Sequence, residues 1–359
     1  INGSKPVIVK APGLVAPDFT WETVTQMDFG FDASFLNNRL TGTFDWYRRN
    51  TKDMLVAGAT LPATLGASVP KSNSADMKTI GWELSLGWND RLENGFSYWV
   101  KGVLSDYQAT ITKYAGNDAG FYSQSDGDGK YYVGQKIGEI WGYHSNGLFQ
   151  SDDEAATIDQ SELYAGKWGA GDVKYEDLDN DGKITKGEET IYNPGDKSII
   201  GNKTPRYQFG ITVGFDYKNF DFEMFWQGTG KRDYMLSGAQ FWGFTSQWDV
   251  PYTPALDYWT ETNTDAYFPR PGWQNGGNRV TSDRYLQSAA YGRLKNLTVG
   301  YTIPKNLTTK WGISRLRLYV TGENLLTITP LNDAFDPETL GGMTYPINRK
   351  VAIGLNLTL

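Results

Sequence analysis

The feature that most constrains the fold of this chain is a strict alternation of apolar and polar residues near its end. The apolar positions are Val351, Ile353, Leu355, Leu357 and Leu359, and the residues between them are small or polar. Successive side chains of a β-strand point to opposite faces, so this segment has one apolar and one polar face. Its length fits the roughly 9 to 11 residues that a tilted strand needs to cross a bilayer.

Earlier segments repeat this alternation, each with one strongly apolar face. They are 26–35, 80–89, 208–217 and 296–303. A weaker candidate strand follows each of them. These partners are 40–49, 96–108, 220–228 and 314–326. The pattern predicts an all-β fold with nine strands, or ten if another strand lies before Gln26.

The connections between these strands alternate between short and long. The short connections are 36–39, 90–95, 218–219 and 304–313, and the long ones are 51–77, 110–204, 229–290 and 327–347. Long irregular loops count against a compact soluble domain, and a secreted β-sandwich or lectin predicts no such asymmetry. Outer-membrane barrels have short periplasmic turns and long extracellular loops. With Leu359 in the periplasm, every connection falls on the expected side, which predicts a transmembrane antiparallel β-barrel.

Composition narrows the class further. No window approaches the roughly 18 apolar residues of a membrane helix, so a helical membrane protein is excluded. The mean hydropathy of −0.49 does not contradict a barrel, whose strands are apolar only at alternate positions. The chain has no Cys, which removes disulfides and Cys-ligated metals, and its net charge of −7 argues against nucleic acid as a partner.

The sharpest local motif lies at 177–188 and fits the calcium-loop pattern D-x-[DN]-x-[DN]-G-x5-E. Gly182 permits the sharp turn, and Ile184 would anchor the loop from behind. The candidate Ca²⁺ ligands are Asp177, Asp179, Asp181, the Lys183 carbonyl and Glu188. The alternative is an acidic solvated turn. Because 173–175 reads as extended, we expect an EF-hand-like loop without flanking helices, with a structural Ca²⁺ ion.

Catalytic signals are weak. His144 is the only histidine, so a Ser-His-Asp site would have to use it, and an ordinary hydrogen bond is the simpler interpretation. Loop carboxylates are plentiful, but nothing singles out a glycosidase pair. We therefore predict no catalytic residue and no enzyme.

Several aromatic residues of the long loops are candidates for contact with a substrate or partner. Flat apolar rings with polar edges suit stacking on sugar rings. The residues are Trp242, Trp248, Tyr252, Trp259 and Trp273. The alternative is that they pack the loop against itself.

Short motifs in a fixed order connect the chain to a known family. They are 20–22 (TWE), 36–40 (LNNRL), 81–85 (GWELS), 145–150 (SNGLFQ), 200–202 (IGN), 219–221 (NFD), 285–296 (YLQSAAYGRLKN), 322–327 (GENLLT) and 335–338 (FDPE). Together they resemble the SusC/RagA family of TonB-dependent transporters. Each motif is weak alone, whereas the ordered set is specific. One departure is the terminal Leu359, where outer-membrane barrels usually end in an aromatic residue.

The resemblance implies a plugged barrel of 22 strands, of which residues 1–359 would form the C-terminal nine or ten. The chain opens at Ile1 without an initiator Met or signal peptide, so we expect the N-terminal plug and first strands to be absent. Residues 110–204 would be a long extracellular loop carrying the calcium motif. An open sheet leaves unpaired backbone groups that lipid cannot satisfy, so missing strands must close it.

The resemblance also implies a function and partners. It indicates TonB-dependent import of a large polar nutrient, an oligosaccharide or else a peptide, across the bacterial outer membrane. A SusD-type surface lipoprotein would act as a lid, TonB would supply energy through the absent N-terminal part, and outer-membrane lipid would surround the barrel. The alternatives are a non-energised porin or adhesin and an outer-membrane hydrolase.

Overall fold

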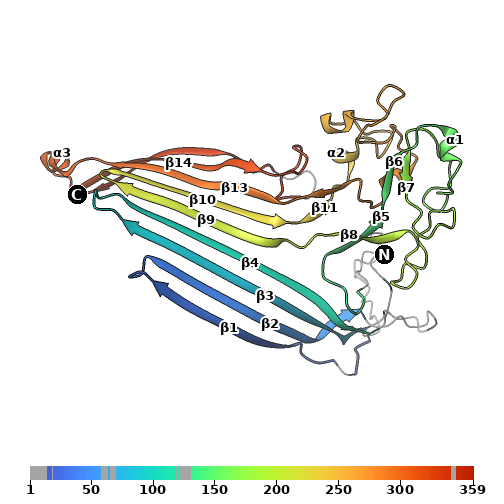
Figure 1. Ribbon diagram of the computed structural model, residues 1–359, viewed down its shortest axis with the longest axis horizontal. Coiled ribbons are helices and arrows are strands. Elements are labelled where there is room, and N and C mark those ends of the chain that lie inside the picture. The colour runs from blue at the N-terminus through green and yellow to red at the C-terminus, as the bar shows by residue number, and fades with distance from the viewer. Residues whose placement is uncertain are drawn as a thin grey trace, which may run out of the picture.

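The computed structural model describes residues 14–17, 19–57, 64, 70–115, 117, 120, 131–340 and 345–359. Within them, nine strands form one antiparallel sheet, which confirms the predicted all-β class and strand number (Figure 1). In sheet order the strands are β1 (Thr23–Phe35), β2 (Leu40–Ala57), β3 (Lys71–Arg91), β4 (Ser97–Tyr114), β9 (Arg206–Tyr217), β10 (Phe220–Lys231), β13 (Tyr291–Thr302), β14 (Arg315–Ile328) and β15 (Lys350–Thr358). No tenth strand precedes Gln26 in the described part of the chain.

The strand register places the predicted apolar residues on one face of the sheet. Residues paired directly across antiparallel strands lie on the same face. One such row crosses five strands and consists of Phe31, Phe44, Leu84, Leu104 and Phe209. A one-residue slip would move every side chain of a strand to the other face, so the row fixes the register.

The neighbouring row on the opposite face is small or polar. It consists of Gly30, Asp45, Glu83, Ser105 and Gln208. On this face, aromatic rings of one strand lie over glycines of the next. A Cβ atom on Gly81 would lie 2.5 Å from the end of the Tyr47 ring, so a larger residue there would displace that ring. Trp99 covers Gly214 in the same way.

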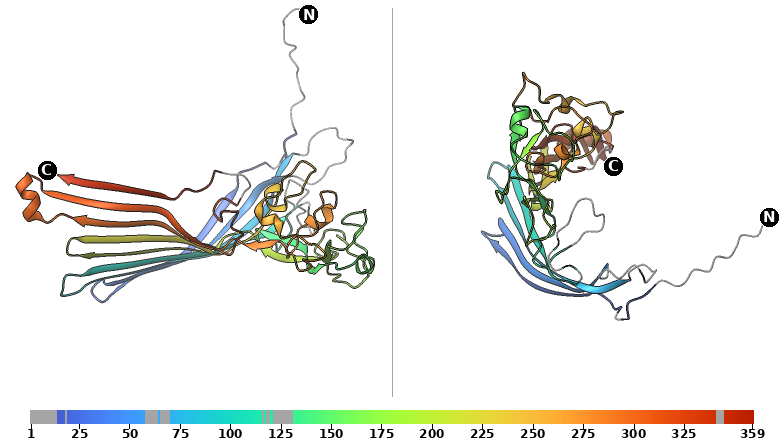
Figure 2. Two further views of the ribbon diagram at one scale, coloured as in Figure 1. Left: turned by 90° about the horizontal axis from the view of Figure 1, so that it is seen from above. Right: turned by 90° about the vertical axis from the view of Figure 1, so that its right-hand side faces the viewer.

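The sheet is curved and open, with β1 and β15 at its two edges (Figure 2). The short turns lie at one end of the sheet, together with the C-terminus, and the long connections lie at the other end (Figure 1). Strands β2 to β4 continue toward the long connections well beyond the length that a bilayer requires. Each predicted long loop therefore begins within a strand. In the loop predicted at 51–77, for example, β2 runs to Ala57 and β3 starts at Lys71.

The long connections form a second structural unit, which we call the loop domain and define as residues 131–205, 232–290 and 329–340. It contains three small antiparallel ribbons. They pair β5 (Glu139–Tyr143) with β8 (Lys197–Asn202), β6 (Ser145–Leu148) with β7 (Val173–Tyr175), and β11 (Asp233–Met235) with β12 (Leu286–Ser288).

Short helices complete the described structure. They are α1 (Asp152–Ala155), α2 (Ala239–Trp242) and α3 (Lys305–Thr308), with 3₁₀ turns at Thr253–Leu256, Gly276–Arg279 and Thr309–Trp311. Helix α1 begins with a cap in which the Ser151 side chain accepts from the Glu154 backbone N–H. No helix among the described residues is long and apolar enough to cross a membrane.

Candidate functional site

The loop domain has its own hydrophobic core, built from all three of its segments. Phe241 is fully buried at its centre, with edge-to-face ring contacts to Phe268, Tyr285 and Phe335. Further buried members are Tyr143, Leu148, Val173, Tyr175, Ile184, Leu236, Trp242, Ala289, Leu331 and Leu340. Segments that are nearly two hundred positions apart in sequence therefore share one core, and the long loops are not independent excursions.

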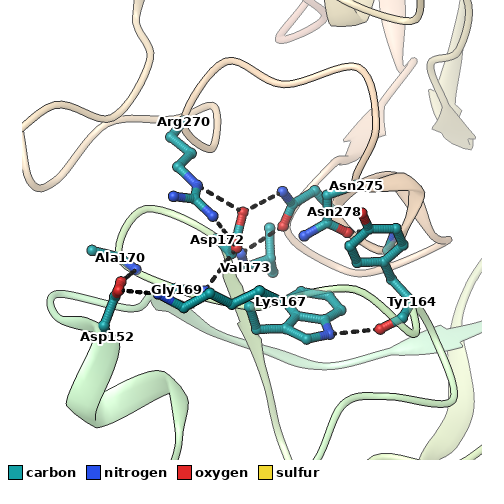
Figure 3. A network of polar contacts seen from close by, with 12 residues as sticks. Asp152, Tyr164, Lys167, Gly169, Ala170, Asp172, Val173, Arg270, Asn275 and Asn278 are labelled. Carbon is teal, nitrogen blue, oxygen red and sulfur yellow. Dashed lines mark hydrogen bonds and ion pairs between the residues drawn. The ribbon is translucent and has the colours of Figure 1, made fainter.

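Polar contacts join two of these segments, 131–205 and 232–290 (Figure 3). Asp172 is 1% exposed and accepts hydrogen bonds from Arg270 at 3.0 Å, Asn278 at 2.8 Å and the Gly169 backbone at 2.9 Å. Asn278 also accepts from the Val173 backbone N–H at 2.8 Å. These bonds satisfy a buried carboxylate and fix residues 169–173 against residues 270–278.

The predicted calcium loop lies on the surface of this domain, and Ile184 behind it is fully buried in the core, as expected. Strand β7 precedes the loop, so the motif has no helix on that side. The backbone turns through Asn180 and Gly182, which have φ values of 61° and 83°. Asp177 accepts from the backbone N–H groups of Asn180 at 2.6 Å and Gly182 at 2.8 Å.

Three carboxylates converge in this loop, and one of them lies outside the motif. Asp177, Asp179 and Asp196 each place an oxygen within 4.8 Å of the other two. Asp196 is fully buried and accepts from the backbone N–H groups of Leu178 and Thr185, both at 2.7 Å. It arrives there because the chain between Thr185 and Asp196 doubles back on itself.

The remaining motif residues are placed differently from the expected ligand set. Asp181 accepts from the backbone N–H of Lys183 at 2.8 Å, and both residues are exposed. Glu188 is exposed, and neither it nor Asp181 belongs to the three-carboxylate cluster. The sequence pattern therefore missed Asp196, which lies eight positions beyond the end of the motif and has no motif of its own.

The electrostatics of the cluster favour a cation. Partial desolvation, together with the negative charges of Asp181, Asp196 and Asp177, raises the pKa of Asp179. For Asp177, desolvation acts in the same direction, but the backbone donors of Gly182, Asn180 and Asp181 outweigh it and lower the pKa. Two or three charged oxygens at such distances repel one another unless a hard cation lies between them.

The five aromatic candidates divide into two groups. Trp242 is 9% exposed and packs in the core against Tyr285 and Phe268, so its face is closed to a sugar ring. Trp259 packs against the same core. Trp248, Tyr252 and Trp273 are exposed, and Trp248 reaches 82%. The expectation of a contact surface therefore narrows to these three residues.

His144 makes the contacts of a serine–histidine–aspartate relay. Its Nδ1 lies 2.7 Å from Asp283 Oδ2, and its Nε2 lies 2.7 Å from Ser198 Oγ. However, Ser198 lies within β8, whose backbone pairs with β5, and not at the sharp turn that exposes a nucleophile. Asp283 is exposed and also accepts from the Ser145 backbone at 2.9 Å. We interpret the group as a polar link between two segments of the loop domain.

The FDPE motif at 335–338 fastens the loop domain to the sheet. Arg293 on β13 is 2% exposed, and its guanidinium lies 2.5 Å from Asp336 and 2.9 Å from Glu338. Lys295 adds a second contact to Glu338 at 2.9 Å. Phe335 belongs to the loop-domain core, so this short segment contacts both parts of the molecule.

Comparison with known proteins gives the family. Residues 6–325 match the family model described as TonB dependent receptor-like, beta-barrel. The chain is 30% identical to TonB-dependent receptor P3 of Formosa agariphila, over 96% of this chain and 35% of that protein. It is 26% identical to TonB-dependent receptor SusC of Bacteroides thetaiotaomicron, over 94% of this chain and 32% of that protein.

Among solved structures, one titled as the RagAB peptide transporter is similar with a TM-score of 0.72 and 22% identity, covering 95% of this chain and 36% of that one. This likeness shows a shared fold. The chain spans about a third of the length of the curated relatives it matches. The resemblance stated from the sequence motifs is thus confirmed, and the chain belongs to the TonB-dependent receptor-like β-barrel family of the bacterial outer membrane.

Proposed function

We propose that this chain forms the C-terminal wall and loop domain of a receptor that imports a large polar nutrient with energy from TonB. The observation that carries the proposal is the match of residues 6–325 to the receptor barrel family. The asymmetry between short turns and a folded loop domain supports it, since an importer must bind its nutrient at the outer side. A plug domain and the first strands, supplied by the rest of the receptor, would close the open sheet.

The test is uptake by whole cells that carry the intact receptor. Labelled oligosaccharide should accumulate in cells with TonB and fail to accumulate when TonB is deleted or the proton gradient is collapsed. Uptake that persists in both conditions would favour the porin alternative. Breakdown of the oligosaccharide by the purified receptor alone would favour the hydrolase alternative.

A SusD-type lipoprotein is the proposed partner of the loop domain. The support is an exposed apolar stretch on its surface, where Trp248 is 82% and Val250 77% exposed. Solvent-exposed aromatic residues of this size are enriched at protein interfaces. In a pull-down with the lipoprotein, Trp248→Ser should reduce recovery of the intact receptor, whereas unchanged recovery with Trp248→Ser and Val250→Ser together would remove this surface from the proposal.

A Ca²⁺ ion is the proposed structural cofactor of the acidic loop. Asp177, Asp179 and Asp196 supply oxygens of the hard, anionic type that Ca²⁺ prefers, and Glu188 or Asp181 can complete the set if the loop closes around the ion. The ion would neutralise the crowded carboxylates and hold the loop against the core through Ile184. Extracellular sites are filled even when weak, with affinities of roughly 10⁻⁴ to 10⁻³ M.

A further inference from the structure

A cavity of about 530 Å³ opens between three parts of the loop domain. Strands β5 and β8 form one wall, β11 forms a second, and residues 279–281 form a third. Ligand pockets in proteins range over roughly 300 to 1,000 Å³, so the cavity has the size of a binding site. Lys186 of the acidic loop reaches its lining, but the three-carboxylate cluster does not, nor do Trp248 and Val250.

The charge of this cavity is opposite to that of the chain. Its lining contains four basic and two acidic side chains, whereas the whole chain carries a net charge of −7. The basic residues are Lys186, Lys197, Lys203 and Arg279, and the acidic ones are Glu139 and Glu162. A concave wall with surplus positive charge in a negatively charged protein attracts anions.

Of the four lining cations, Lys197 pairs with Glu189 at 2.7 Å, whereas the other three are only partly neutralised by the protein itself. Lys203 makes no ion pair with any residue that the structure describes. Arg279 donates to the carbonyl oxygens of Phe244, Gly272 and Trp273, which carry no full charge. Lys186 lies 3.9 Å from Glu162, at the far limit of an ion pair. An arriving anion can therefore pair with these groups without first breaking a tight salt bridge.

The acidic side of the cavity is better satisfied. Glu139 accepts from the Tyr132 hydroxyl at 2.5 Å and from the Lys136 backbone N–H at 3.2 Å. These neutral donors engage both carboxylate oxygens but leave the negative charge of Glu139 in place. Because Lys197 is paired with Glu189, the lining retains a surplus of one positive charge, from Lys186, Lys203 and Arg279 against Glu139 and Glu162. Glu162 remains as an acceptor for hydroxyl donors of a ligand.

Aromatic side chains line the same cavity. Trp141, Tyr143 and Tyr234 contribute to its walls. Rings provide flat apolar surface with polar edges, which suits the faces of sugar rings, while carboxylate and lysine groups suit their hydroxyls. The combination favours a carbohydrate that carries negative charge.

We propose that this cavity binds an acidic oligosaccharide, with the anionic group of one sugar held by Lys186, Lys203 and Arg279. The inference rests on the proposed import function and deepens it by naming the substrate class. Acidic here means a sugar with a carboxylate or sulfate group, since both present the same oxygen acceptors to lysine and arginine.

The experiment measures binding to the intact, detergent-solubilised receptor by titration calorimetry. The probes are tetragalacturonic acid, maltotetraose as its neutral counterpart, and a tetraglutamate peptide. The variants are Lys203→Glu and Lys186→Glu, which reverse charges on the cavity wall. The matched control is Lys310→Glu, an exposed lysine at the opposite end of the sheet, which changes the net charge by the same amount.

We expect tetragalacturonic acid to bind better than maltotetraose and to lose about tenfold in affinity with either cavity variant but not with Lys310→Glu. Added salt should weaken its binding. Equal binding of the acidic and neutral sugars, or equal effects of all three variants, would overturn the inference. Charge-dependent binding of tetraglutamate alone would overturn the carbohydrate class.

The import proposal is tested apart from this, by TonB dependence in whole cells. Uptake that requires TonB but shows no preference for acidic sugars would leave the transport proposal standing and remove only the inference about the cavity. Charge-dependent binding together with uptake that does not require TonB would leave the inference about the cavity standing and remove the transport proposal.

Discussion

The nine-stranded sheet, which we call the wall, and the loop domain are stabilised in opposite ways, although one continuous chain builds both. The wall hides few large apolar side chains, and those of its edge strands are exposed, as at Ile353, which is 83% exposed. Its stability depends on ladder hydrogen bonds and on a surrounding medium that accepts an apolar face. Nearly all of the buried apolar residues lie in the loop domain. That unit resembles a small water-soluble domain with an irregular backbone.

The two parts differ because one faces lipid and the other faces water. In the wall, a strict alternation decides which face each residue occupies, and packing between distant segments matters little. In the loop domain, alternation is lost, and stability depends on ring packing around Phe241 and on buried polar bonds such as those of Asp172. Changes in one part should therefore leave the other part intact, except at the contacts between them, such as those of Arg293 and the backbone bonds between residues 109–111 of β4 and residues 134–137.

The largest expected effect is in the loop core. Phe241→Ala should cost about 3 to 5 kcal/mol, because it leaves a cavity among five aromatic neighbours. Limited proteolysis should then cleave within residues 232–290, while the wall keeps its heat-resistant migration on gels. Trp248→Ala, an exposed aromatic of the same segment, serves as the control and should change neither property. Unfolding of the wall by Phe241→Ala would contradict the separation of the two parts.

The next effect is in the wall. Leu355→Lys should cost roughly 2 to 4 kcal/mol near the middle of a lipid-facing strand and should reduce assembly of the receptor. Ala352→Lys, on the other face of β15 and opposite the uncharged Thr321, is the matched control and should be tolerated. Assembly is measured as heat-modifiable mobility of the membrane fraction. If the two substitutions are equally harmful, the assignment of the two faces is wrong.

A smaller effect is expected at the connection between the two parts. Glu338→Gln should cost about 1 to 3 kcal/mol, because Arg293 and Lys295 each lose a charged partner while Asp336 still pairs with Arg293. Hydrogen exchange should rise in residues 331–340 and little elsewhere. Glu323→Gln is the control, because its pair with Lys350 is exposed and 3.6 Å long, and it should cost at most about 1 kcal/mol.

The subtlest effect concerns the acidic loop and changes sign with Ca²⁺. The raised pKa of Asp179 means that its charge destabilises the cation-free fold. The contribution of Asp179 is thus fully present below its unfolded pKa of about 3.9 and is lost as pH rises through the raised folded value. With chelator, Asp179→Asn should therefore slow amide exchange in the loop at neutral pH.

With Ca²⁺ present, the same substitution should speed amide exchange, since a ligand is lost. Lowering the pH through the raised folded pKa of Asp179 toward about 3.9 should likewise protect the cation-free loop, because this carboxylate gains a proton, and should weaken the loaded one. Asp177, whose pKa is lowered, keeps its stabilising charge throughout this range. Identical exchange with and without Ca²⁺ would reduce the motif to an acidic turn.

The wall was predictable from the sequence because a period-two pattern leaves only one choice of face. All nine strands and the short turns follow from it. The largest error in strand length is that β2 and β3 extend into the loop predicted at 51–77. The shared core of the loop domain was not predictable in this way. Its contacts join residues such as Leu148 and Leu331, which no local periodicity relates.

The candidate site was predictable only where a local motif defines it. Asp177 and Asp179 follow from the calcium-loop spacing, whereas Asp196 reaches the cluster through a fold of the chain after Gly187. Trp242 is of a residue type that suits stacking on sugar rings, but its side chain is buried in the core. Likewise, Ser198 and Asp283 meet His144 through tertiary structure alone.

Spin labelling of β15 in membranes tests most directly whether the alternating residues of the wall separate a lipid-facing from a water-facing side. The chain has no Cys, so single cysteines at positions 351 to 358 can each carry one nitroxide. Collision with oxygen, which dissolves in lipid, should peak at Val351, Ile353, Leu355 and Leu357. Collision with a water-soluble nickel complex should be low at those positions. Oxygen access without a period of two, or peaks at Ala352, Gly354 and Asn356, would contradict the account.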